Sequence, residues 1–222
     1  MIAIDGPVAS GKTAVGLRLA RELGYRLVDT GMMYRAVTWL ALRRGVDVED
    51  EAALTALAEA ARIELGQPSA NGGATIRVDD TDVTAELRSP DVDRNVSFVS
   101  RVAGVRRAMV ARQRSLAREG RLIMLGRDIG SVVLPDAPVK IYLDASPAER
   151  ARRRHRELAE AGVDRSEADI LAELEQRDEM DRQRHLSPLR PAADALVIDT
   201  DDLTLEEVVD RVRAAAGAPA TG

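Results

Sequence analysis

Residues 6–13 read Gly-Pro-Val-Ala-Ser-Gly-Lys-Thr, and this octapeptide decides the fold. It matches the pattern G-x-x-x-x-G-K-[ST] of a phosphate-binding loop. A short apolar run, Met1–Ile4, precedes it, and a helical pattern, Ala14–Leu23, follows it. In this strand–loop–helix setting, successive backbone N–H groups form a concave cradle for phosphate at the N-terminus of a helix.

The side chains of this loop add specific chemistry. Lys12 is placed to reach the β- and γ-phosphates of a nucleotide, and the Thr13 hydroxyl to ligate Mg²⁺. An ordinary glycine-rich turn is the alternative, but Lys12 and Lys140 are the only lysines among 32 basic residues. A lysine in so arginine-rich a chain indicates a slot for a compact ammonium group. The predicted nucleotide-binding residues are Gly6, Pro7, Val8, Ala9, Ser10, Gly11, Lys12 and Thr13.

Composition narrows the class of protein. The chain has 222 residues, 45% hydrophobic and 31% charged, as in globular proteins, and it has no cysteine for disulfide or thiolate chemistry. A net charge of −5 disfavours non-specific binding to nucleic acid. The sequence shows neither an apolar run long enough to span a membrane nor a leader pattern. We therefore expect a cytoplasmic protein, monomeric, with neither nucleic acid nor membrane as a partner.

Apolar segments alternate with helical patterns along most of the chain. Strands are predicted at residues 2–4, 26–28, 122–125, 139–143 and 195–198, and helices at 14–23, 32–44, 102–119, 147–161 and 166–184. This alternation predicts an α/β fold with a five-stranded parallel sheet flanked by helices. Residues 63–87, with Asn71-Gly72-Gly73 as a turn signal, predict a small antiparallel β insertion. The segment from Ala214 to Gly222 is predicted to be a disordered tail.

Arginines gather where a parallel sheet places its ligands. Arg35 and the dipeptide Arg127-Asp128 follow predicted strands, at the edge where such sheets bind ligands. A further run lies between Arg150 and Arg156, and Arg177, Asp181 and Arg184 share one helix face. Phosphoryl transfer requires cations that neutralise the transferred group. The alternative for both helical groups is a solvated surface of weak ion pairs.

Other polar and aromatic residues have simpler interpretations. His155 and His185 lie in charged segments and are interpreted as surface residues, and Trp39 as part of the core. The sequence has no cluster with metal-ligand spacing.

Several longer segments carry a resemblance to a known family. They are Ile4-Asp5-Gly6-Pro7, Asp29-Thr30-Gly31-Met32-Met33-Tyr34-Arg35, Gly126-Arg127-Asp128-Ile129-Gly130, Leu134–Ile141, Glu149-Arg150-Ala151, Arg177-Asp178 and Ser187-Pro188-Leu189. From Ile2 to about Val212 the chain resembles the bacterial cytidylate kinases, nucleoside monophosphate kinases of the P-loop class. The resemblance implies a single kinase domain over 1–222. Within it lie a monophosphate-binding part at 31–100 that holds the β insertion and a lid at 149–165.

The resemblance also implies roles for individual residues. The catalytic set would be Lys12, Arg127, Arg150 and Arg154, with Arg153 beside them, ATP as phosphoryl donor and Mg²⁺ held by Thr13. The acceptor would be CMP or dCMP, and Pro191–Asp194 would lie beside the adenine. Ser97, Arg106 and Asp128 would read the cytosine edge, because Asp128 can accept from the exocyclic amine and the other two can donate to ring N3 and the carbonyl. The implied substrate-binding residues are Thr30, Tyr34, Arg35, Ser97, Arg106, Arg127, Asp128, Arg177, Asp181 and Arg184.

Two positions depart from the family pattern, and three other functions remain open. Leu125 stands where an acidic residue is usual, and Met32 where a small one is usual. The alternatives are a kinase of another small metabolite, a GTP-binding switch and an inactive nucleotide-binding scaffold. The Asn-Lys-x-Asp motif that reads guanine is absent from the sequence. The hypothesis that accounts for most residues is ATP-dependent phosphorylation of CMP in pyrimidine metabolism.

Overall fold

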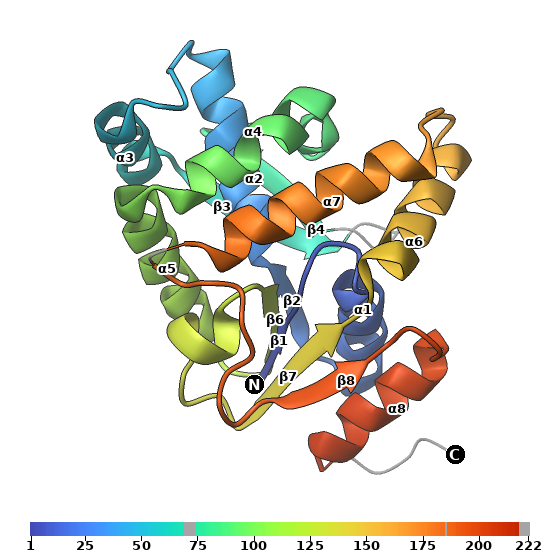
Figure 1. Cartoon of the computed structure of the whole chain (residues 1–222). Coiled ribbons are helices and arrows are strands. Elements are labelled where there is room, and N and C mark those ends of the chain that lie inside the picture. The colour runs from blue at the N-terminus through green and yellow to red at the C-terminus, as the bar shows by residue number, and fades with distance from the viewer. Residues whose placement is uncertain (69–73, 185, 218–222) are drawn as a thin grey trace. The chain divides into compact units, whose positions relative to one another are not determined.

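A computed structural model describes residues 1–68, 74–184 and 186–217 of the chain (Figure 1). The chain divides into two compact units. The first comprises Met1–Tyr25 and Leu125–Gly222, and the second comprises Arg26–Met124.

A five-stranded sheet has the strand order β2-β6-β1-β7-β8. The strands are β1 (Ile2–Asp5), β2 (Arg26–Asp29), β6 (Leu122–Gly126), β7 (Val139–Asp144) and β8 (Leu196–Asp199). β1 pairs in parallel with β7, placing Ile4 opposite Ile141, and β7 pairs in parallel with β8. β1 and β6 are buried along their whole length, as expected for strands covered on both faces. Each of these five strands was predicted, and each observed strand end lies within one residue of the predicted end.

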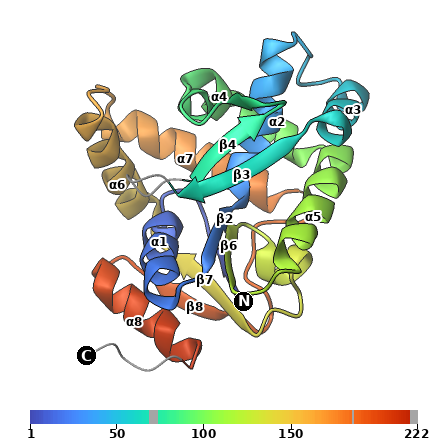
Figure 2. The same ribbon diagram turned by 180° about the vertical axis from the view of Figure 1, so that it is seen from behind.

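The helices of the first unit are α1 (Lys12–Leu23), α6 (Pro147–Glu160), α7 (Glu167–Arg182) and α8 (Leu205–Ala215). α1 and α8 lie side by side, and α6 packs against α7 to form a helical hairpin (Figures 1 and 2). Ser146 and Ser166 cap α6 and α7, each accepting a hydrogen bond from a backbone N–H three residues later. The Asp169 carboxylate in turn accepts a hydrogen bond from the Ser166 hydroxyl.

Helix α8 was not predicted. Its signal was the capping box in which Thr204 and Glu207 satisfy each other's backbone N–H groups. The helix ends at Ala215, so the predicted disordered tail overlaps its last two residues. Residues 218–222 lie outside the described part of the chain.

The second unit has an aliphatic core between four helices and a small sheet. The helices are α2 (Thr30–Arg43), α3 (Glu51–Ala60), α4 (Pro90–Arg101) and α5 (Ala103–Ala117), and a 3₁₀ turn, η1, covers Glu86–Arg88. The three-stranded sheet, β3 (Ile63–Pro68), β4 (Ala74–Val78) and β5 (Thr81–Asp82), is antiparallel and confirms the predicted β insertion. The turn signal at 71–73 lies outside the described residues. Trp39 packs partly buried against this core, with the Arg43 guanidinium 5.0 Å from its ring.

Helices α3 and α4 were missed by the sequence analysis, although both carry a cap. The Asp50 carboxylate caps α3, and Ser89 caps α4 with proline in its first turn. Among the described residues, no helix is both long enough and apolar enough to cross a membrane.

Candidate active site

The loop between β1 and α1 has the backbone geometry of an anion cradle. Gly6 adopts φ +149°, and a Cβ there would lie 2.1 Å from the Leu143 carbonyl oxygen. Gly11 adopts φ +91° and starts α1 with no side chain capping its first N–H groups. Those amides are therefore available to an anion. Ser10 lies buried in the loop.

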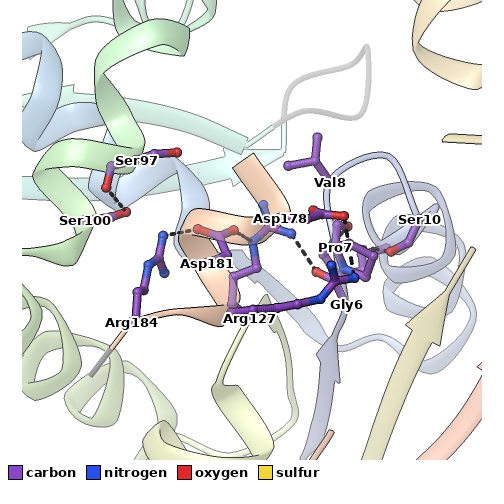
Figure 3. Close-up of polar contacts among 12 residues, drawn as sticks. Gly6, Pro7, Val8, Ser10, Ser97, Ser100, Arg127, Asp178, Asp181 and Arg184 are labelled. Atoms are coloured by element: carbon purple, nitrogen blue, oxygen red, sulfur yellow. Dashed lines mark hydrogen bonds and ion pairs between the residues drawn. The ribbon is translucent and has the colours of Figure 1, made fainter. Parts of the chain in front are cut away.

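Basic side chains bind three successive carbonyl oxygens of this loop (Figure 3). Arg127 donates to the Gly6 carbonyl at 2.8 Å, Lys12 to that of Pro7 at 2.5 Å, and Arg150 to that of Val8 at 3.2 Å. Lys12 lies within hydrogen-bonding distance of Ser10 as well, at 3.4 Å. The three cations surround the cradle with positive charge.

A cavity of about 570 Å³ opens beside the loop, within the first unit. One wall is a face of α6 with residues at helical spacing, and another follows the end of β8. Arg153 joins these walls, since it donates to the hydroxyl of Thr200 at 3.0 Å and to its carbonyl at 2.6 Å. The lining residues are Val8–Val15, Glu149, Arg153, Arg154, Arg156, Glu157, Glu160, Thr200, Asp201, Leu203, Leu205 and Val208. Thr13, the predicted Mg²⁺ ligand, is exposed in this lining.

Asp5, the last residue of β1, supports the loop on its other side. Its two carboxylate oxygens accept from the N–H groups of Ile129 and Gly130, each at 2.8 Å. The pKa of Asp5 is raised to about 6, mainly by burial and to a lesser degree by the charge of Asp128, whereas the two N–H groups and Lys12 lower it. Asp5 thus anchors the segment after Arg127-Asp128 to the end of β1. Asp5 is not among the predicted site residues, although its position directly before Gly6 is visible in the sequence.

Arg127 and Asp181, two of the predicted site residues, form an ion pair. The Arg127 Nε lies 3.0 Å from an Asp181 carboxylate oxygen, and Arg184 binds the other oxygen (Figure 3). Asp181 is 1% exposed, so the alternative of a solvated surface face fails for it. Arg177 lies half-buried on the same helix. Asp128 is buried at the start of a single π-helical turn, η2 (Ile129–Val133).

The arginine run of α6 divides into a buried and an exposed part. Arg150 is 1% exposed and pairs with Asp178 of α7, contrary to a solvated run. Arg154 pairs with Glu157 at 3.0 Å on the cavity side. His155 is half-buried rather than exposed, and His185 lies outside the described residues.

The predicted acceptor residues of the second unit lie on α2, α4 and α5. Arg106 is buried, with its guanidinium 5.4 Å from the Tyr34 ring and its Nη1 3.3 Å from the Ser100 carbonyl. Ser97 is buried in α4, where its carbonyl accepts from the Ser100 hydroxyl (Figure 3). Within this unit the structure therefore brings Tyr34 and Arg106 together.

Arg35 and Thr30 both lie on α2 in the second unit. Arg35 donates to the Leu87 carbonyl at 2.9 Å and pairs with Asp93 at 2.5 Å. Thr30 is buried in the first turn of α2, which Asp29 caps. The Arg35 guanidinium thus has protein partners on two neighbouring segments.

Pro191–Asp194 do not lie where the resemblance implied. Lys140 Nζ binds both carboxylate oxygens of Asp194, at 2.9 and 2.7 Å, and Lys140 lies opposite Ala3 near the amino ends of the strands. The phosphate cradle lies at the carboxyl ends instead. Leu125, the departure from the family pattern in β6, is buried.

Comparisons with known proteins agree on one family. A family model described as Cytidylate kinase matches residues 2–217. The chain is 46% identical to a cytidylate kinase of Pelotomaculum thermopropionicum over 98% of this chain and 96% of that protein. It is 47% identical to a bifunctional pantoate ligase/cytidylate kinase of Synechococcus sp. over 96% of this chain, but spans only 39% of that longer protein.

A solved structure supports the fold alone. An uncharacterized protein from Eubacterium ventriosum superposes with a TM-score of 0.50 at 12% identity, with 98% of each chain covered.

Proposed function

The chain belongs to the cytidylate kinase family, and we propose that it transfers the γ-phosphoryl group of ATP to CMP and to dCMP, giving CDP or dCDP and ADP. The observation that carries this proposal is the cradle itself: the N-terminal turn of α1 and the Lys12 ammonium lie in the lining of a cavity that arginines also line. Such a site suits a triphosphate, because backbone dipoles and fixed cations both favour concentrated negative charge.

The donor would lie in the cavity beside the loop. Its triphosphate would occupy the cradle of residues 6–13, and its adenosine would extend between α6 and the segment Thr200–Val208. Mg²⁺ fits this site with the Thr13 hydroxyl and phosphate oxygens as ligands, since Mg²⁺ needs few protein ligands. When bound, the ion neutralises charge on the β- and γ-phosphates. No group of three or more His, Cys, Asp or Glu residues that could hold a metal is found in the described ranges.

The acceptor would be bound by the residues that the family resemblance implies. Arg35 and Arg127 would bind the monophosphate, with Thr30 and Tyr34 nearby. Arg177, Asp181 and Arg184 would contact ribose and phosphate. Ser97, Arg106 and Asp128 would select cytosine, because uracil presents a carbonyl where the amine was and a carboxylate would repel it.

The reaction needs no general base in this scheme. Lys12, Arg127 and Arg154 would stabilise the group in transfer, whose charge spreads over its equatorial oxygens. The 149–165 segment, which includes most of α6, would act as a lid that excludes water, so that ATP is not hydrolysed. The expectations of a cytoplasmic monomer and of a role in pyrimidine metabolism remain predictions.

A panel of nucleoside monophosphates, assayed with ATP and Mg²⁺ for ADP production, tests the proposal. CMP and dCMP should give the highest rates, UMP a lower rate and AMP and GMP little. Equal rates with and without any monophosphate would contradict the proposal and indicate an ATPase. A complete lack of ADP would favour a binding scaffold, and tight binding of a guanine nucleotide would favour a switch.

A further inference from the structure

Two acidic residues of α7 each hold an arginine that reaches the phosphate-binding loop (Figure 3). Asp181 holds Arg127, which donates to the Gly6 carbonyl. Asp178 holds Arg150, which donates to the Val8 carbonyl. The first arginine belongs to the set proposed for catalysis. The second differs, because its side chain is buried and each of its three guanidinium nitrogens already donates to a protein oxygen.

All three nitrogens of the Arg150 guanidinium donate to protein oxygens. Nε donates to the Ala145 carbonyl at 3.1 Å, Nη1 to the Val8 carbonyl at 3.2 Å, and Nη2 to an Asp178 carboxylate oxygen at 2.5 Å. The side chain is 1% exposed and is absent from the lining of the cavity. In this arrangement Arg150 holds the loop, the end of β7 and α7 together.

Apolar contacts reinforce the same connection. Ala151 of α6 and Ile170 and Leu174 of α7 form a buried cluster, and the Val8 side chain packs against it. Val8 is therefore attached to the hairpin twice, by its side chain and by its carbonyl. Arg150 lies in the first turn of α6 and Asp178 near the end of α7, so the attachment lies at the base of the hairpin and not at its tip.

The bond to the Val8 carbonyl also orients the next backbone amide. The described peptides are all trans, and in a trans peptide the C=O and the following N–H point in opposite directions. The Ala9 N–H therefore points away from Arg150, and Ala9 lines the cavity with the unusual φ of 60°. We propose that Arg150 and Asp178 are positioning residues that fix the Val8–Ala9 peptide, and with it the triphosphate cradle, to the base of the α6–α7 hairpin. This inference rests on the proposed function of the cradle.

Stability alone does not account well for this pair. A buried ion pair can often be replaced by apolar residues without loss of stability, because desolvation of the two charges offsets their attraction. The second carboxylate oxygen of Asp178 is buried and has no hydrogen-bond partner among the described residues. A pair optimised for stability would satisfy that oxygen.

The test compares an apolar replacement, Arg150→Met with Asp178→Leu, with the wild-type protein. The control makes the same types of change, Arg213→Met with Glu22→Leu, at a mostly buried ion pair 3.2 Å long that joins α8 to α1 and does not line the cavity. Three quantities are measured: the thermal unfolding midpoint, the affinity for the non-hydrolysable analogue AMP-PNP with Mg²⁺ by calorimetry, and kcat with CMP. We expect the replacement to unfold within a few degrees of wild type, while AMP-PNP affinity and kcat each fall about tenfold. Arg150→Lys should recover part of both losses, and the control should match wild type.

A folded replacement with wild-type AMP-PNP affinity and kcat would overturn the inference. The inference would also be overturned if the losses of AMP-PNP affinity and kcat disappeared when the replacement was cooled to a temperature at which it is stably folded. If the double replacement does not fold, Asp178→Asn provides the test. This change keeps the size of the side chain and one acceptor oxygen but removes the charge. It should lower AMP-PNP affinity about threefold, and an unchanged affinity would overturn the inference. Since AMP-PNP binding needs no turnover, a wild-type protein that binds it without phosphorylating CMP would refute the proposed function and leave this result intact.

Discussion

The phosphate-binding loop and the predicted acceptor group of the second unit are built in different ways. The loop uses eight consecutive residues and relies on backbone amides, with cations on its outward carbonyls. The acceptor group uses side chains from α2, α4 and α5, and its buried arginine lies against an aromatic ring. Backbone recognition of phosphate can be written in one short motif, whereas recognition of a base edge needs helices that are distant in sequence.

The largest effect should follow from loss of the loop ammonium. Lys12→Met should lower kcat about a thousandfold, because no other side chain of the loop can place a positive charge on the transferred phosphoryl group. Steady-state kinetics with ATP and CMP measure this change in kcat. The matched control is Lys140→Met, whose ammonium binds Asp194 at the other end of the strands. An equal loss of kcat in both variants would show that the position of Lys12 in the loop has no special importance.

Gly6→Ala should be the next most severe change. Its Cβ would lie 2.1 Å from the Leu143 carbonyl oxygen at φ +149°, so the loop must shift. We expect a loss of about 3 kcal/mol in the free energy of unfolding, measured in urea, together with weakened ATP binding. Gly45→Ala in the second unit is the control, since that glycine has φ +66° but nothing within 4 Å of its Cβ. It should lose only about 1 kcal/mol, and equal losses would show that the carbonyl contact is unimportant.

Changes at the predicted acceptor residues should weaken the use of CMP without weakening the use of ATP. Arg106→Met should raise KM for CMP about thirtyfold while KM for ATP stays within about twofold, because a lost base contact leaves the donor site intact. Asp128→Ala should act in the same direction. Arg112→Met changes an arginine of the same helix that donates to the Glu59 carbonyl, and should leave both constants unchanged. Wild-type kinetics in Arg106→Met and Asp128→Ala would refute the pocket assignment.

The smallest effect concerns pH and Asp5 beneath the loop. Its pKa is about 6 in the folded protein against 3.8 as the ordinary value, so the folded state binds the proton more tightly. Its contribution to stability therefore declines as pH rises from about 4 to about 6 and levels off above that range. Between pH 5 and 7.5 the decline should be about 1 kcal/mol. The charged groups facing it are Asp128, which favours the proton, and Lys12, which opposes it.

Urea unfolding of wild type and Asp5→Asn at the two pH values measures this contribution as a difference. The variant should be less stable overall, because one amide oxygen replaces two acceptors for Ile129 and Gly130. Its change between the two pH values should nevertheless lack the wild-type decline. An identical pH dependence in both proteins would show that Asp5 does not titrate in this range.

The five-stranded sheet could be predicted from local patterns. The five strands are short apolar runs that end in polar turns, and such runs are recognisable without knowledge of their neighbours. Helices α3, α4 and α8 were missed although the capping residues Asp50, Ser89 and Thr204 marked their starts. Of the predicted acceptor residues, Thr30, Tyr34, Ser97 and Arg106 came only from the family resemblance, since nothing local connects Tyr34 with Arg106.

The phosphate cradle could be recognised from the sequence alone, because its eight residues are contiguous and its glycines can adopt the backbone angles that the loop requires. Only the tertiary structure decided which arginines of α6 face inward. Arg150 and Arg154 lie four residues apart in one charged run, yet the first is buried against Asp178 and the second borders the cavity. Helical periodicity assigns residues to faces but does not say what covers each face, and that neighbour decides whether an arginine is solvated, paired or directed at a ligand.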